Sequence, residues 1–96
     1  MKKRTYNNIE DLGKDLGLSK EQITIAKMKT QLKKKIRSTI SKKDLTITEV
    51  SVMSGLSRTV VSGIVNGSLQ SVSIERLIKL GNALELKINL TVKEAA

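Results

Sequence analysis

Leu45 to Gly67 is the stretch that most restricts how this chain can fold, because it reads as two short helices joined by a tight turn. Thr46 or Thr48 can cap the first helix, since a hydroxyl oxygen accepts a hydrogen bond from an unpaired amide of the first helical turn. Gly55 can adopt the positive φ that ends this helix, and Ser57 can cap the second one. The pattern predicts a helix-turn-helix, whose second helix presents one face outward.

The second helix of this pair divides into an apolar side and a small polar side. Its core positions are Leu56, Val61, Ile64 and Val65, and its outward positions are Ser57, Arg58, Thr59, Ser62, Gly63 and Asn66. Such a face can enter a DNA major groove, where Arg58 can donate two hydrogen bonds to guanine O6 and N7 and Thr59 can contact thymine. We therefore predict a DNA-reading surface here. The alternative is the ordinary exposed face of a surface helix.

The composition removes several competing functions. With 96 residues the chain is long enough for one domain. It has no Cys and no His, so we expect no zinc site, no metal, no cofactor and no imidazole acid-base chemistry. Tyr6 is the only aromatic residue, which argues against single-strand binding by base stacking. The acidic residues are scattered, so an enzyme is not expected, and without a secretory signal or membrane helix the cytoplasm is the expected location.

Positive charge is concentrated in the first half of the chain. The net charge is +9; residues 1–44 hold 13 Lys and Arg against 5 acids, whereas residues 45–96 hold 5 against 4. Residues 1–8 read as a flexible basic arm, and residues 9–96 as a single helix-turn-helix domain. We predict phosphate contacts from Lys34, Arg37 and Lys43, while a solvated helix surface is the alternative reading of the same lysine-rich stretch.

Apolar periodicity predicts a mainly α-helical bundle of about five helices. Residues 9–18 favour a short helical turn, and Ser19 with Gln22 has the spacing of a capping box at the start of the longest helix. The expected core positions of this longest helix are Ile25, Met28, Leu32, Ile36 and Ile40. Those of the first helix of the helix-turn-helix are Ile47, Val50, Val52 and Met53, and those of the last helix are Ile74, Leu77, Ile78, Leu80, Ala83 and Leu84. Ser71 or Ser73 can cap the last of these.

The pattern changes after the last helix. Residues 86–92 alternate apolar and polar side chains, with Leu86, Ile88, Leu90 and Val92 on one side, as in a β-strand with one buried face. A lone strand leaves its backbone groups unpaired, and the only other candidate strand is a weak one around residues 4–9. We therefore predict that 86–92 is a dimerisation strand that pairs with its copy in a second subunit across a two-fold axis.

These residues carry a family resemblance. The run LTITEVSVMSGLSRTVVSGIVNG resembles the helix-turn-helix of the lambda-repressor-like (Xre) superfamily, in its Leu-Thr opening, Gly-Leu-Ser turn and Asn-Gly ending. With the segments DLGKDLGLSKEQ, SIERLIKLGNAL and LKINLTV, residues 7–93 are similar to the HigA-like antitoxin subgroup. The resemblance implies base contacts by Arg58, Thr59 and Ser62. The chain departs from the family pattern at Ile47, where Gln is frequent, and at Val50, where a small Ala is frequent.

What the resemblance implies is a dimeric repressor that binds an inverted-repeat operator in double-stranded DNA. It further implies the antitoxin of a type II toxin-antitoxin module that regulates its own operon, with a toxin similar to HigB or RelE as a possible partner. Two alternatives stay open. One is a stand-alone Xre-family transcriptional regulator without a toxin, and the other is a toxin-neutralising interaction protein with little DNA binding.

Overall fold

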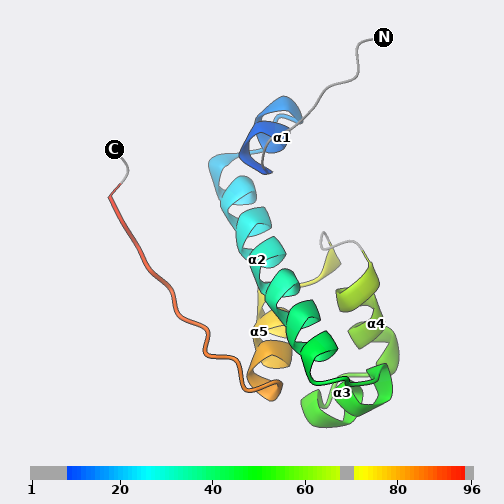
Figure 1. The fold of residues 1–96 in the computed structure, drawn as a ribbon. Coiled ribbons are helices and arrows are strands. Elements are labelled where there is room, and N and C mark those ends of the chain that lie inside the picture. The colour runs from blue at the N-terminus through cyan, green and yellow to red at the C-terminus, as the bar shows by residue number, and fades with distance from the viewer. Residues whose placement is uncertain (1–8, 68–70, 95–96) are drawn as a thin grey trace.

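Five α-helices follow one another in the part of the chain that the structure describes. The structure, a computed structural model, describes residues 9–67 and 71–94; the predicted basic arm, residues 1–8, lies outside the described residues. The helices are α1 (Ile9–Asp15), α2 (Lys20–Lys42), α3 (Ile47–Ser54), α4 (Arg58–Asn66) and α5 (Ile74–Ala83) (Figure 1). The mainly helical fold and the position of the helix-turn-helix, α3 and α4, are as the sequence predicts. Of the helices described, none is long and apolar enough to cross a membrane.

Hydroxyl side chains begin four of the helices. The Ser19 Oγ accepts from the Gln22 N–H at 3.1 Å, and the Gln22 Oε1 accepts from the Ser19 N–H at 2.8 Å, which confirms the predicted capping box of α2. A second capping box at α3 joins Thr46 and Glu49 in the same way, at 3.1 and 3.0 Å. Ser57 caps α4 and Ser73 caps α5. The starts of these four helices are therefore fixed by local sequence signals.

Four helices end on a residue with positive φ or just before one, and at α1 this residue is Gly17 (φ 74°). Gly55 ends α3 with a φ of 73°, as predicted. Beyond α2 and α5 the same left-handed conformation is held by Asp44 (φ 52°) and Glu85 (φ 64°), which carry a side chain. The Leu86 N–H donates to the Gly81 carbonyl at 3.0 Å, which closes the Schellman arrangement at the end of α5. Glu85 thus sets the direction in which the chain leaves the bundle.

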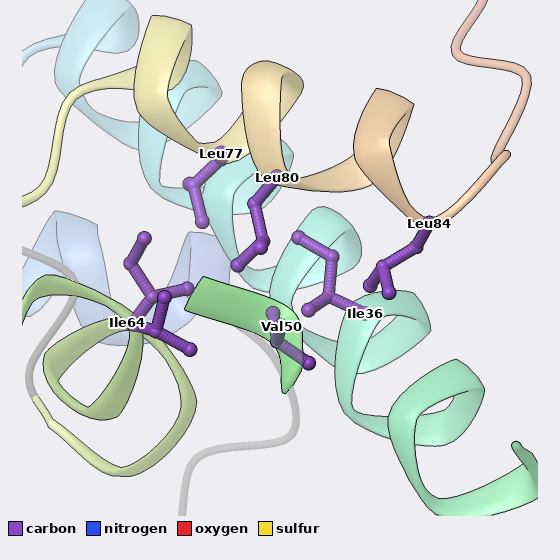
Figure 2. Packing of buried hydrophobic residues seen from close by; sticks show 7 residues of the cluster. Ile36, Val50, Ile64, Leu77, Leu80 and Leu84 are labelled. Carbon is purple, nitrogen blue, oxygen red and sulfur yellow. The ribbon is translucent and has the colours of Figure 1, made fainter. Parts of the chain in front are cut away.

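The core lies where α2, α3, α4 and α5 meet. Its fully buried side chains are all aliphatic: Ile36, Val50, Val61, Ile64, Leu77, Leu80 and Leu84 (Figure 2). Helix α1 contributes none of them and packs instead against the N-terminal part of α2. There, a Cβ added to Gly13 would lie 2.6 Å from the Ile23 Cγ1, so these two helices approach closely. The core therefore fixes α3 and α4 on the half of α2 that is far from α1.

Several predicted core positions are wrong. Val52 is 79% exposed, because at about 100° per residue it lies about 200° around α3 from the buried Val50. Met53 is 44% exposed, at the last turn of the same short helix. Ile25 is also 44% exposed, because it lies about 200° around α2 from Ile23, the buried residue on the side of α2 that packs against α1. Regular apolar spacing overestimated how far along α2 the core reaches.

The predicted β-strand is not present in the described chain. Residues 86–94 form neither helix nor strand, and in Figure 1 they leave α5 as an arm that runs away from the bundle. Leu86 and Ile88 are half-buried, and a Cβ on Gly81 would lie 2.8 Å from the Ile88 Cδ1, so this part rests on α5. Leu90 and Val92 are 75% and 81% exposed. A strand needs a hydrogen-bonding neighbour, and the described residues supply none.

Candidate nucleic-acid interface

Side-chain hydrogen bonds fix the turn between α3 and α4. The Ser51 Oγ donates to the Leu56 carbonyl at 2.6 Å, and the Leu56 N–H donates to the Ser54 Oγ at 3.2 Å. Ser54 is only 6% exposed, so its hydroxyl acts inside the turn. With Gly55 in the left-handed conformation, these bonds hold the start of α4 in a defined position relative to α3. Neither serine was predicted to fix the turn, although a polar residue flanking a predicted turn is a usable signal.

The outward side of α4 forms one shallow depression together with the start of α3. Its lining residues are Ile47, Arg58, Thr59, Ser62, Gly63, Asn66 and Gly67. Arg58, Thr59 and Asn66 are exposed, and Ser62 is half-buried at the floor of the face. The structure thus brings together the outward residues named from the sequence, except Ser57, whose hydroxyl caps α4 by accepting from the Val60 N–H at 3.2 Å. Their role in reading DNA stays a prediction.

The two glycines of this face have opposite surroundings. A Cβ built on Gly63 would meet no atom within 4 Å, so this position opens directly to solvent. A Cβ on Gly67 would lie 2.6 Å from the Gly63 carbonyl oxygen. Gly67 is therefore required by the end of α4, where its N–H donates to that same carbonyl at 2.9 Å. Gly63 has no such structural role, and its absent side chain leaves room over the face.

A lysine of α2 holds the far end of α4. The Lys33 Nζ donates to the Gly67 carbonyl at 2.9 Å, although 34 residues separate the two in the chain. The partly negative C-terminus of a helix favours a cation, and α4 has no basic residue in its own last turn. Helix α5 shows the same arrangement, since the Lys43 Nζ donates to the Leu84 carbonyl at 3.3 Å. Neither contact can be predicted from local sequence patterns.

The basic residues predicted to contact phosphates lie on α2 and beyond its end, and do not line the depression. Lys34 and Arg37 are exposed. Arg37 follows Lys33 by one helical turn, and residues four apart lie on the same side of a helix, so Arg37 lies on the α4 side of α2. Lys43 is bonded at the end of α5. Of these three residues, Arg37 is the one that lies on the side of α2 facing α4.

Ile47 lines the depression, although its spacing predicts a core position. It was expected on the inner side of α3, and it does pack against the core while remaining half-buried. As the first residue of α3, directly after its cap Thr46, it also reaches the depression beside α4. The helix start follows from the Thr46 and Glu49 spacing, so this second role of Ile47 is a consequence of that capping box.

The comparisons agree with this architecture. No curated protein and no solved structure gave a significant match. A family model described as a helix-turn-helix domain matches residues 12–93, which include α2 through α5 and most of the C-terminal arm. A helix-turn-helix domain is typical of DNA-binding regulators, and proteins of this family are typically not enzymes. The chain belongs to the helix-turn-helix domain family, of the lambda-repressor-like type that its sequence resembles.

Proposed function

We propose that this protein is a sequence-specific repressor that binds double-stranded DNA as a homodimer. The observation that carries the proposal is the depression over α4, where Arg58, Thr59 and Asn66 are exposed beside the open position of Gly63. A helix face with short side chains can approach the base edges of a major groove closely, and Arg58 supplies the donors that recognise guanine.

Selectivity and affinity come from different parts of the molecule in this proposal. Arg58 is the only formally charged residue of α4, so the reading helix contributes little nonspecific attraction. Helix α2 and its end carry the dense positive charge, with exposed Lys34 and Arg37 available to phosphates. Contacts to phosphate raise affinity for every sequence and depend steeply on salt, whereas base contacts discriminate between sequences.

In the proposed dimer, the C-terminal arms of the two subunits pair. Leu90 and Val92 alternate with exposed polar residues and are open to solvent in the single chain. Pairing of two arms across a two-fold axis would satisfy their backbone groups and cover these side chains, and the strand predicted from the sequence would form at that step. Two reading helices would then face successive turns of an inverted-repeat operator.

The proposal extends to a biological setting through the HigA-like resemblance. There the repressor is the antitoxin of a type II toxin-antitoxin module, controls its own operon and binds a toxin similar to HigB or RelE. A stand-alone regulator of the same family is the alternative. Co-expression with the product of the neighbouring gene separates the two, because an antitoxin co-purifies with that product and protects the cell from it.

Selection of bound sequences from random duplex DNA, at a stated salt concentration, tests DNA reading directly. We expect an inverted repeat. Arg58→Ala should then cost about 1–3 kcal/mol on the selected site and relax the preference at one base pair, because a bidentate contact is lost. Lys34→Ala is the matched control, and it should weaken all sequences alike and reduce the salt dependence. Equal preference for selected and random DNA in the wild-type protein would contradict the proposal.

A second candidate function is neutralisation of a toxin with little DNA binding. The exposed apolar side chains of Leu16, Leu90 and Val92 favour it, since such residues often mark a protein interface. In that case the selection returns no sequence, while the neighbouring gene product still co-purifies.

A further inference from the structure

We infer that the depression between α3 and α4 reads thymine through its 5-methyl group, with Ile47 as the apolar wall of the contact and Gly63 as the space that admits it. This inference rests on the proposed DNA-reading function and names the base that the same face selects. It goes beyond the guanine contact of Arg58, because it assigns a specificity role to a residue of the supporting helix.

The chemistry of the depression is mixed, with polar groups on α4 and an aliphatic side chain on α3. Ile47 is half-buried against the core, so its position is fixed by packing, and its remaining surface faces the depression. An isoleucine offers no hydrogen bond to a phosphate or to a base edge. In a major groove the one apolar group that a standard base presents is the thymine methyl group. Ile47 therefore favours thymine over the other bases at the position that it faces.

Gly63 supplies the room that a methyl group needs. A Cβ at this position would meet no protein atom within 4 Å, and Gly63 itself lines the depression. Thr59, one helical turn before Gly63, lies on the same side of α4 and adds a further methyl group. Ile47, Thr59 and Gly63 thus line the same open depression as Arg58. The half-site should accordingly contain thymine close to the guanine that Arg58 reads.

The test replaces single thymines of the selected duplex by deoxyuridine, which removes the methyl group and leaves base pairing unchanged. Binding of each duplex to the full-length protein is measured by titration at fixed salt. We expect one thymine in each half-site to lose about fourfold in affinity, the worth of one buried methyl group. Thymines outside the inverted repeat are the internal control and should lose nothing.

Gly63→Ala provides the protein side of the test, because this variant has open space for its methyl group and keeps the fold. Its own methyl group takes the place of the thymine methyl, so its preference for thymine over uracil should disappear at that one position. Ile47→Gln should also remove the preference, but Ile47 packs against the core, so Gly63→Ala is the decisive variant.

The outcomes separate the inference from the proposed function. If the selection returns a sequence but no thymine is sensitive to loss of its methyl group, or if Gly63→Ala keeps the full thymine preference, the inference is wrong and DNA reading stands. If the selection returns no sequence at all, the proposed function itself fails.

Discussion

Gly63→Ala should make the protein more stable, although the residue lies on the face that we assign to DNA. Glycine inside a helix costs about 0.5–1 kcal/mol relative to alanine, because the unfolded glycine has more conformational freedom to lose. At Gly63 nothing opposes that gain, since the added Cβ meets no atom within 4 Å. For a domain of this size each 1 kcal/mol shifts the melting temperature by about 4–8 °C, so the expected rise is about 2–8 °C.

Gly67→Ala is the matched control, because it adds the same methyl group one helical turn further along. Here the Cβ would lie 2.6 Å from the Gly63 carbonyl oxygen, which is backbone and cannot rotate away. The chain must shift at the end of α4, which disturbs the bonds that the Gly67 N–H and carbonyl make to Gly63 and to Lys33. Loss of one such bond costs about 1 kcal/mol, so the melting temperature should fall.

Both variants can be compared by thermal unfolding followed by far-ultraviolet circular dichroism, at equal protein concentration because a dimer makes melting concentration-dependent. The prediction is a difference in sign between two identical chemical changes in one helix. A lower melting temperature for Gly63→Ala would refute the reasoning, since it would mean that the surface over α4 is already occupied. Equal shifts for both variants would refute it as well.

Three further predictions concern other parts of the molecule. Glu85→Gly should raise the free energy of unfolding by roughly 0.5 kcal/mol in a urea titration. Glycine removes the strain of the left-handed conformation at φ 64°, and this gain exceeds the larger conformational entropy that glycine loses on folding. A lower free energy of unfolding would contradict this. Lys33→Met should lower the free energy of unfolding by about 0.5–1.5 kcal/mol, because its hydrogen bond to the Gly67 carbonyl is lost, whereas Lys34→Met on the exposed side should change it little. Equal effects of the two variants would show that the Lys33 contact does not stabilise the fold. The double variant Leu90→Ser, Val92→Ser should be a folded monomer in light scattering, because both side chains are exposed in the single chain and would be covered only in the dimer. The control, Asn89→Ser with Thr91→Ser, should remain dimeric. A dimer of the first variant would exclude pairing through the arms.

Local signals in the sequence were sufficient to place the helices. A capping hydroxyl and its partner three residues later are short-range chemistry, so Ser19 with Gln22 could be predicted before any fold was known. The same holds for Gly55, whose positive φ ends α3. The outward face of α4 also follows from the sequence, because helical geometry alone separates Arg58 and Thr59 from the buried Val61 and Ile64.

Features that depend on distant parts of the chain were not predictable. Ile25 has the right spacing for a core residue, but burial there depends on which side of α2 another helix covers, and α1 covers the side of Ile23. Residues 86–92 have a strand pattern, but a strand also requires a neighbour. The Lys33 contact with Gly67 spans 34 residues, so only the assembled bundle reveals it.

The contacts of Lys33 and Lys43 with the ends of α4 and α5 have a consequence for how the domain folds. Neither α4 nor α5 carries a basic residue in its own last turn, so the charge that stabilises each C-terminus comes from α2 or from Lys43, the residue that follows α2. A helix of 9 residues such as α4 is too short to persist alone in water. The reading helix is therefore a cooperative product of the whole bundle, and it forms and melts together with α2.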